Sequence, residues 1–165
     1  MTEPILIAGP TASGKSQFAL ALAREFDGVI INADSCQVYQ ELSVISARPS
    51  VADMEDIPHR LYGHISGVVP YSTGLWLDDV SRVLDEIKEL GKRAIFVGGT
   101  GLYFQALLNG LSEVPEIEPS IRAYWRAEAE RVGSETLHGI LVDKDPLMAE
   151  VLNPGDTQRI VRALE

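Results

Sequence analysis

Residues 9–16 read GPTASGKS and constrain this chain more than any other stretch. They fit the phosphate-binding pattern in which a glycine and four further residues precede Gly-Lys-Ser. The two glycines let the backbone curl until several N–H groups point at one anion, and a helix that begins near Gly14 adds its positive N-terminal end. Lys15 can reach terminal phosphate oxygens, and the hydroxyl of Ser16 is placed to ligate Mg²⁺. The pattern predicts a loop that binds a di- or triphosphate, formed by Gly9, Pro10, Thr11, Ala12, Ser13, Gly14, Lys15 and Ser16.

The flanks of this loop are those that the pattern requires, a strand before it and a helix after it. Residues 5–8 are a short apolar run of the buried-strand type. After the loop, apolar side chains recur at helical spacing from Phe18 to Phe26, until Gly28 supplies a C-terminal stop. An ordinary glycine-rich turn, the alternative interpretation, would not account for both flanks.

Composition indicates a chain with one ordinary core and no membrane partner. Its 165 residues are 45% hydrophobic with a net charge of -10, which argues against a generally basic protein that coats nucleic acid but permits a local basic patch. The lone cysteine, Cys36, excludes an intramolecular disulfide framework and a cysteine-rich zinc site. No apolar stretch reaches the roughly 18 residues that span a bilayer, and no signal peptide is visible. We therefore expect a cytoplasmic protein.

Strands and helices that alternate over the first part of the chain indicate a parallel α/β sheet with flanking helices. Residues 29–31 and 94–97 read as two further buried strands, and residues 73–90 as an amphipathic helix between them. Residues 40–72 contain several prolines and glycines, and we expect mostly loop with short elements there. Three strands would leave poorly covered sheet edges, so we expect the core to be incomplete in this chain.

The chain changes character after a short helix expected over residues 102–108. Four further helices are expected without strands between them, and the last ends without a stop signal. We divide the chain into a phosphate-loop core of residues 1–112, a helical insertion of residues 113–157, and a helix of residues 158–165 that returns to the core. The four helices are expected over residues 121–132, residues 135–142, a stretch that begins at Asp145-Pro146, and residues from about 157 to the end.

Polar residues follow the second strand, at the sheet edge where open α/β folds bind ligands. Asp34 lies there, whereas the third strand ends in Gly98-Gly99 without the Mg²⁺-binding carboxylate expected of a motor or GTPase. In small-molecule kinases an acid near this place can accept a proton from the phosphate acceptor. The alternative is that Asp34 caps the turn after its strand. Spacing alone therefore predicts a phosphate-loop transferase and no particular substrate.

Five motifs in order narrow this prediction: GPTASGKS at 9–16, NADSCQVY at 32–39, GGTGLYF at 98–104, Asp145-Pro146 with Ala149, and QRIVRALE at 158–165. With them the chain resembles the tRNA dimethylallyltransferases over nearly its whole length. That family prenylates N6 of the adenosine just 3′ of the anticodon, in tRNAs that read codons beginning with U. Its chains continue well beyond this point, which agrees with the low strand count.

The resemblance implies a role for each motif. The loop would bind the diphosphate of dimethylallyl diphosphate, and Ser16 would ligate Mg²⁺. Lys15 would stabilise the negative charge that develops on the diphosphate as the C–O bond breaks. Asp34 would accept a proton or a hydrogen bond from the adenine N6 amine, and Thr100 would complete the catalytic set. The flipped-out adenosine and the surrounding tRNA would contact Asp34, Ser35, Cys36, Gln37 as reader of the base edge, Thr100, Arg122, Gln158, Arg159, Ile160, Val161 and Arg162.

The chain departs from the family pattern at two places. Residues 45–49 read ISARP where many members have Gly-Thr-Ala-Lys-Pro, and His59-Arg60 stands where many have a His-His pair. Arg48 keeps the positive charge, but Ile45 removes a flexible glycine and could reshape the prenyl pocket. These departures concern the pocket and leave the expected reaction unchanged.

Other interpretations of the chain and of single residues stay open. The function could be that of an adenylate isopentenyltransferase, although a mononucleotide needs no helical insertion, or of a small-molecule kinase that binds ATP. A third alternative is that this chain by itself only binds RNA or diphosphate and is inactive. We expect a monomer. Cys36 fits a small packing residue better than a reactive thiol, and Trp76 fits the core. Arg122 could be a solvated helix charge, and Arg159 and Arg162 could pair with carboxylates on their own helix instead of following an RNA backbone.

Overall fold

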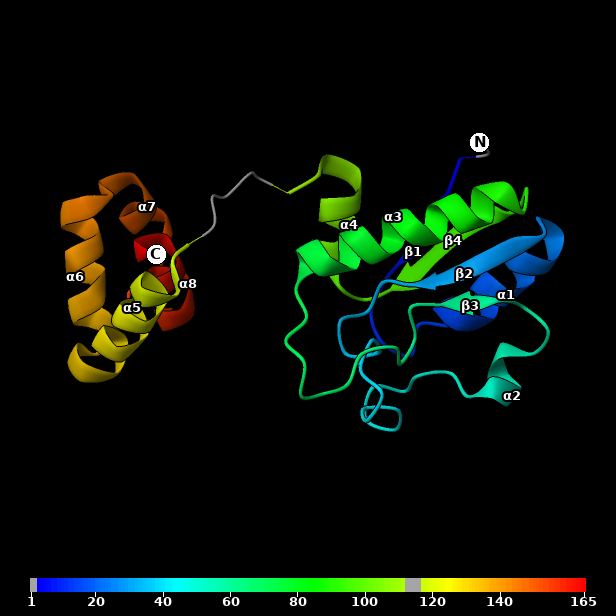
Figure 1. The fold of residues 1–165 in the computed structure, drawn as a ribbon, viewed down its shortest axis with the longest axis horizontal. Coiled ribbons are helices and arrows are strands. Elements are labelled where there is room, and N and C mark those ends of the chain that lie inside the picture. The colour runs from blue at the N-terminus through cyan, green and yellow to red at the C-terminus, as the bar shows by residue number, and fades with distance from the viewer. Residues whose placement is uncertain (1–2, 112–116) are drawn as a thin grey trace. The chain divides into compact units, whose positions relative to one another are not determined.

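A computed structural model describes residues 3–111 and 117–165, and the chain forms two compact units, Met1–Ser112 and Glu113–Glu165. Strands lie only in the first of these units among the described residues, and the second is built from helices (Figure 1). The division falls where the sequence predicts the change from alternating strands and helices to helices alone.

Four parallel strands form the sheet of the first unit, in the order β1-β4-β2-β3. Three of them are the predicted ones, and β3 is a two-residue strand inside the stretch expected to be mostly loop. Ala8 pairs with Gly98 and Asn32 with Val97, so the carboxyl ends of β1, β4 and β2 meet at one edge (Figure 1). The strands are β1 (Ile5–Ala8), β2 (Gly28–Asn32), β3 (His59–Arg60) and β4 (Arg93–Gly98).

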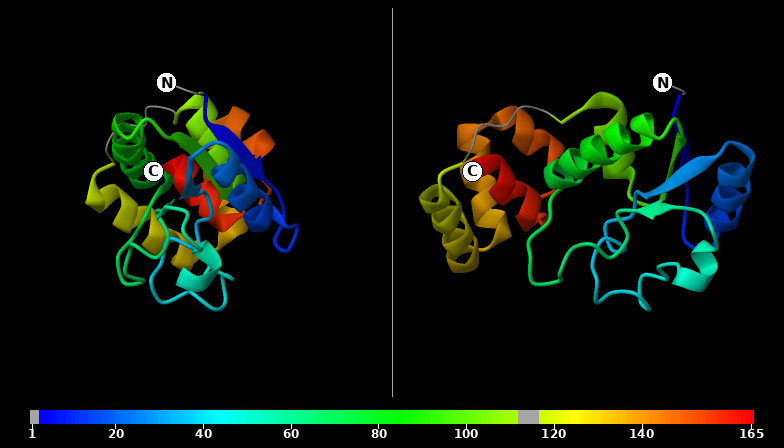
Figure 2. Two further views of the ribbon diagram at one scale, coloured as in Figure 1. Left: turned by 90° about the vertical axis from the view of Figure 1, so that its right-hand side faces the viewer. Right: turned by 45° about the vertical axis from the view of Figure 1, so that its right-hand side comes forward.

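Helices cover both faces of this sheet, as a buried parallel sheet requires. On one face α1 (Lys15–Glu25) packs its Ala19, Leu20 and Ala23 against β2 and β4. On the other face α3 (Thr73–Glu89) and α4 (Gly101–Asn109) bury a larger cluster that centres on Trp76, which is fully buried as predicted. The two views in Figure 2 show α1 and α3 on opposite sides of the strands. A short helix, α2 (Val51–Met54), lies in the long connection before β3.

The buried stripe of α1 differs from the one that the sequence suggests. Phe18 and Phe26 are 58% and 43% exposed, although their spacing places them on the apolar side of the helix. The small side chains of Ala19 and Ala23 let the helix lie close to the sheet, and the larger rings stay at its margin. The Phe26 ring lies 5.0 Å from the guanidinium carbon of Arg93, a cation–π distance.

The second unit has its own core, formed by Leu137, Leu141, Ala149, Ile160 and Val161. Residues 158–165 lie in this unit, and their predicted return to the core stays a prediction. They belong to α8, whose apolar side packs against α5 and α6 and leaves Ile160 fully buried. No helix in the two described ranges is long and apolar enough to cross a membrane. The helices are α5 (Pro119–Val132), α6 (Ser134–Lys144), α7 (Pro146–Val151) and α8 (Thr157–Leu164).

Candidate functional site

The phosphate-binding loop joins β1 to α1 and has the curled backbone that the sequence predicts. Ala12 and Gly14 both adopt positive φ angles, 62° and 82°, which turn successive N–H groups toward one side of the loop. The Lys15 ammonium donates to the Pro10 carbonyl oxygen and lies 3.5 Å from the Ser13 hydroxyl oxygen, so it folds back over the loop. These bonds place a cation and a set of backbone N–H groups around one point, where an anion can be bound.

The turn after β2 is organised by Asn32, a side chain for which sequence reasoning predicted no role. Asn32 is fully buried, and its Nδ2 donates to the carbonyl oxygens of Asp34 at 2.9 Å and Leu61 at 3.0 Å. Its Oδ1 accepts from the Asp34 N–H at 3.0 Å. Since a buried amide keeps such bonds only in one geometry, Asn32 fixes the position of Asp34.

Asp34 caps this turn and also faces the end of β4. Its Oδ1 accepts from the Cys36 N–H at 2.9 Å, so the turn-capping interpretation is confirmed. Its Oδ2 lies 3.5 Å from the point where a β-carbon on Gly99 would stand. One oxygen is therefore engaged locally and the other points toward the glycines beside the loop. Proton acceptance by Asp34 stays a prediction.

Thr100 holds the same turn from the other side. Its Oγ1 accepts from the Ser35 N–H at 2.9 Å and lies 3.2 Å from the Ser35 hydroxyl oxygen. Its own N–H donates to the Ala33 carbonyl oxygen at 3.2 Å. Its hydroxyl therefore positions the segment that carries Asp34, and a direct role in catalysis stays a prediction.

Loop and turn line one cavity of about 280 Å³ at the carboxyl edge of the sheet. Lys15 and Ser16 come from the loop, Asp34 and Gln37 from the turn, and Gly98 from β4 between them. The glycine at the end of β4 is required by packing, because a β-carbon there would lie 2.0 Å from the Ala33 carbonyl oxygen. The structure thus brings the predicted phosphate loop and the predicted acid to one site.

The side chains after Asp34 differ from expectation in what they contact. Cys36 is exposed, so the packing role favoured for it is wrong. The Gln37 amide donates to the carbonyl oxygens of Ser46 at 2.9 Å and Ala47 at 3.4 Å. Gln37 therefore anchors the following loop in this structure, and a role as reader of a base edge would require these two bonds to open.

The connection before α3 runs beside the Asp34 turn and holds it in place. Gly63 and Ile65 donate backbone hydrogen bonds to Gln37 and Val38, at 2.8 and 3.0 Å. The Arg48 guanidinium lies against Gly63, where a β-carbon would stand 1.9 Å from Nη1, and it donates to the Tyr39 carbonyl oxygen at 2.9 Å. The positive charge at Arg48 is therefore used to fix the chain around the cavity.

A second anchor ties the same connection to α3. The Tyr71 hydroxyl donates to the Asp79 carboxylate at 2.5 Å, and the His64 Nε2 lies 3.2 Å from the same oxygen. Burial alone would raise the pKa of Asp79, but the hydrogen bonds from Tyr71 and His64 and the charge of Arg82 outweigh it and lower the pKa. Asp79 therefore stays ionised at neutral pH, and its network supports the segment that flanks the Asp34 turn.

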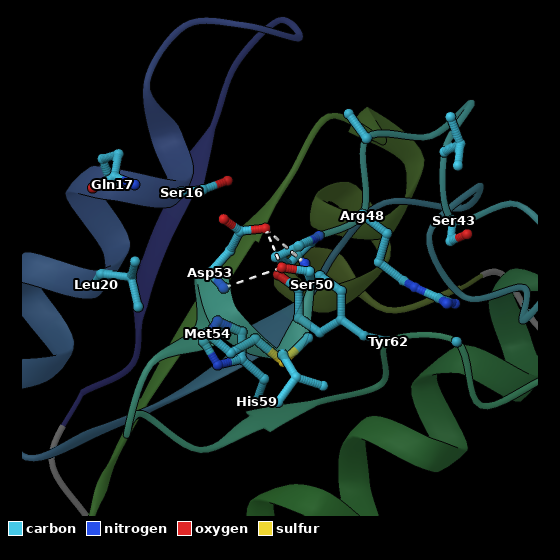
Figure 3. A pocket seen from close by; sticks show the side chains of 15 residues that line it. Ser16, Gln17, Leu20, Ser43, Arg48, Ser50, Asp53, Met54, His59 and Tyr62 are labelled. Atoms are coloured by element: carbon cyan, nitrogen blue, oxygen red, sulfur yellow. Dashed lines mark hydrogen bonds between the residues drawn. The ribbon is translucent and has the colours of Figure 1, made fainter.

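A larger cavity of about 790 Å³ adjoins the first (Figure 3). Ser16, Ala47 and Tyr62 line both cavities, so the two adjoin at these side chains. Burial raises the pKa of the Tyr62 hydroxyl, and the nearby Asp34 charge raises it further, so this hydroxyl stays neutral. Sequence reasoning missed Tyr62 because a lone tyrosine after a two-residue strand carries no motif.

The arginines of the helical unit are paired with carboxylates. Arg122, Arg126 and Arg162 gather around Glu165 at 4.0, 3.9 and 3.1 Å. Arg159 pairs separately with an aspartate at the start of α8, at 3.5 Å. The pairing that we held open for Arg159 and Arg162 is thus present, and RNA contact by these residues stays a prediction. Ile160, expected at the RNA, is instead part of the core, and Val161 is 9% exposed.

The donor set of the loop cavity fits Mg²⁺ and no more elaborate metal centre. Within residues 3–111 and 117–165, no group of three or more His, Cys, Asp or Glu side chains could hold a metal ion. Ser16 supplies one hydroxyl oxygen to the cavity and Asp34 a carboxylate. Mg²⁺ is commonly held by one or two protein oxygens together with substrate phosphates and water, which suits this sparse set.

Comparison with known proteins fits these features. A family model described as IPP transferase matches residues 37–165, more than half of the chain. The chain belongs to this family. A second family model, described as isopentenyl transferase, matches residues 3–68 and so includes the phosphate loop. The resemblance inferred from the five motifs is confirmed.

Curated relatives carry the name tRNA dimethylallyltransferase. The chain is 56% identical over 163 residues to that of Agrobacterium fabrum, which covers 99% of this chain and 55% of the relative. It is 57% identical over 161 residues to that of Chelativorans sp., which covers 97% of this chain and 55% of the relative. The chain thus spans about half the length of the curated relatives that it matches.

Solved structures confirm the expected fold class. A eukaryotic dimethylallyltransferase, whose structures show it acting on tRNA, matches with a TM-score of 0.81 and 30% identity, over 98% of this chain and 40% of its own. The tRNA isopentenylpyrophosphate transferase of Bacillus halodurans matches with a TM-score of 0.66 and 30% identity, over 100% of this chain and 55% of its own. The parallel α/β core with its flanking helices is therefore shared with these enzymes.

Proposed function

We propose that this chain carries the donor-binding and acceptor-activating part of a tRNA dimethylallyltransferase. The observation that supports this most is that Lys15 and Asp34 line one cavity. A phosphate loop needs a cation to bind a diphosphate, and a transfer to an amine needs a group that takes its proton. A cavity that offers both suits transfer of an allylic group from a diphosphate.

In the proposed reaction the N6 amine of adenine attacks the first carbon of dimethylallyl diphosphate. The bond from that carbon to the diphosphate oxygen breaks, and the diphosphate leaves with the electron pair. The Lys15 ammonium and the backbone N–H groups of the curled loop stabilise the charge that develops on the leaving oxygen. Asp34 takes the proton that the amine loses, through the oxygen that does not bond to Cys36.

Mg²⁺ is the cofactor that fits this scheme. When bound, the ion would neutralise part of the diphosphate charge and so assist its departure. The Ser16 hydroxyl and substrate oxygens would hold it, since the described residues offer no larger acidic cluster. The chain's own contribution is to orient the diphosphate along the loop.

We assign tRNA as the acceptor because the core is joined to a unit of helices that carries clustered arginines. Arg122, Arg126 and Arg162 surround one carboxylate, and phosphate groups could exchange for that partner. The relatives are named as enzymes acting on tRNA, in keeping with this assignment. An exposed thiol at Cys36 suits the reducing cytoplasm, where we place the reaction. A monomeric state stays a prediction.

The test uses three substrates and two labels. The chain is incubated with Mg²⁺ and unmodified tRNA, with labelled dimethylallyl diphosphate in one arm and with ATP labelled in its terminal phosphate in the other. A third arm replaces tRNA by AMP. Prenyl label on tRNA supports the proposal, prenyl label on AMP alone supports the adenylate isopentenyltransferase, and transfer only from ATP would refute prenyl transfer in favour of a kinase.

A matched pair of variants locates the chemistry. Asp34→Asn keeps an oxygen that can accept from Cys36, so the turn is preserved while the proton acceptor is lost. We expect it to reduce transfer by at least about a hundredfold, the range of general-base catalysis, with donor binding unchanged. Asp78→Asn, on an exposed position of α3, is the control. Full transfer by Asp34→Asn would remove Asp34 from the mechanism.

A further inference from the structure

The larger cavity adjoins the place where the diphosphate would be bound. Ser16 at the start of α1, Ala47 and Tyr62 contribute to the walls of both cavities. A ligand whose diphosphate lies along the loop can therefore extend its other end past these side chains into the larger space. In an allylic donor the hydrocarbon group is bonded directly to the diphosphate. With the diphosphate on the loop, this group would therefore enter the larger space.

Several polar groups in the wall of the larger cavity are already bound to the protein. Asp53 accepts from the N–H and the hydroxyl of Ser50 at 2.9 and 2.6 Å (Figure 3). The Asp53 N–H donates to the Ser50 hydroxyl oxygen at 3.2 Å, which completes the capping box of α2. The Arg48 guanidinium donates to main-chain carbonyl oxygens. His59 Nδ1 lies 2.8 Å from the Ile57 carbonyl oxygen. These charges and dipoles therefore offer little to a second charged ligand.

The remaining lining combines aliphatic side chains with the polar Gln17 and Ser43. Leu20 comes from α1, Met54 from α2 and Pro49 from the loop between Asp34 and α2. Val44 and Val51 also border the space, but they are 91% and 85% exposed to solvent. Figure 3 shows Met54 between Asp53 and His59 and Leu20 on the opposite wall, so apolar groups face the space from two elements. Apolar surface of this kind gains free energy by covering a hydrocarbon chain.

The volume of the cavity exceeds what a five-carbon group can fill. Pockets of about 300–1,000 Å³ hold drug-sized ligands, and this cavity measures about 790 Å³. A dimethylallyl group would occupy only its entrance beside Tyr62. The unfilled remainder has a lining suited to further carbons of the same chain.

We propose that the site accepts allylic diphosphates longer than dimethylallyl diphosphate, with the ten-carbon geranyl chain extending into the larger cavity. The inference rests on the proposed function, because it takes the loop to bind an allylic diphosphate. Each methylene removed from water contributes about 0.8 kcal/mol, so five further carbons that are only partly covered are expected to tighten binding at least about tenfold.

The test measures binding by calorimetry on the 165-residue chain, with Mg²⁺ in all arms. The ligands are inorganic pyrophosphate, the non-hydrolysable thiolodiphosphates of dimethylallyl and geranyl alcohol, and ATP. The variant Met54→Gln puts a polar amide into the aliphatic lining at nearly unchanged length. Met148→Gln, at a 41% exposed position of α7, is the matched control. We expect Met54→Gln to weaken geranyl binding about fivefold or more, with pyrophosphate binding unchanged in both variants.

The outcomes separate this inference from the function on which it rests. Geranyl binding at least about tenfold tighter than dimethylallyl binding, reduced by Met54→Gln alone, supports the inference. Dimethylallyl binding with equal or weaker geranyl binding overturns the inference and leaves the proposed function standing. Binding of ATP without binding of either allylic analogue overturns both, and assigns the larger cavity to the nucleoside.

Discussion

Replacing Asn32 by alanine is the most direct perturbation of the site, because this buried amide fixes the Asp34 turn. Three hydrogen bonds disappear, two from Nδ2 to the carbonyl oxygens of Asp34 and Leu61 and one from the Asp34 N–H to Oδ1. At about 1 kcal/mol each, their loss lowers the free energy of unfolding by about 3 kcal/mol. For a unit of this size the melting temperature is expected to fall by about 10–15 °C.

The assay follows urea unfolding by tryptophan fluorescence. Trp76 is fully buried in the same unit and its Nε1 donates to the Asn32 carbonyl oxygen at 3.0 Å, so it reports on this region. Both proteins carry Trp125→Phe to remove the signal of the helical unit. Asn109→Ala, at an exposed position of α4, is the control and is expected to change stability by less than about 0.5 kcal/mol. A loss below about 1 kcal/mol for Asn32→Ala would show that water or a shifted backbone replaces the amide, and would refute the reasoning.

Three further predictions concern the loop, the sheet and pH. Lys15→Ala should weaken pyrophosphate binding by about ten- to a hundredfold by calorimetry while Lys88→Ala leaves it unchanged, and equal affinities would exclude Lys15 as the phosphate ligand. Gly98→Ala places a β-carbon 2.0 Å from a carbonyl oxygen and should cost several kcal/mol in urea unfolding, whereas Gly139→Ala, with nothing within 4 Å on α6, should gain up to about 1 kcal/mol. Burial lowers the pKa of His59 below its ordinary value of 6.5, although the bond at its Nδ1 opposes this, so the unfolded chain takes up the proton first as pH falls. The stability due to His59 is thus complete above pH 6.5 and lost below it, and His59→Gln should make unfolding between pH 7.5 and 5.5 less pH-dependent; an unchanged slope would contradict this.

The sequence predicts the elements that depend on local pattern. The strand before the loop, the strand that leads to Asp34 and the seventeen-residue helix α3 are recognisable, because hydrophobic period and flanking glycines are local properties. The phosphate loop is recognisable for the same reason, since its backbone geometry needs glycine at one defined position.

Interactions between distant segments could not be predicted in the same way. β3 is two residues long, and it is a strand only because His59 and Arg60 pair with β2. Asn32 stands inside a recognised motif, but its partners include Leu61, which is far along the chain. Residues that serve the site through such contacts carry no periodic signal of their own.

Local pattern also could not predict which face of an element is buried. Cys36 is exposed although its chemistry suits packing, because the turn that Asp34 caps directs it outward. α8 carries both predicted RNA contacts and buried residues. Only the packing of Ile160 on α6 shows which side of the helix faces the core and which faces solvent. Spacing indicates that two side chains share a helix face, and the tertiary partner decides what that face meets.

The position of β4 between β1 and β2 has a consequence for the size of the site. Neighbouring strands lie about 4.8 Å apart, so the carboxyl ends of β1 and β2 stand about 9.6 Å apart with one strand between them. β1 leads to the loop and β2 to Asp34. The strand β4 between them is therefore a spacer that separates the site of the leaving diphosphate from Asp34, the proposed proton acceptor. Because Gly98 and Gly99 at the end of that spacer bear no side chains, the width stays open to substrate. A second strand between β1 and β2 would widen the site by about 4.8 Å without changing any residue of the loop or of the Asp34 turn.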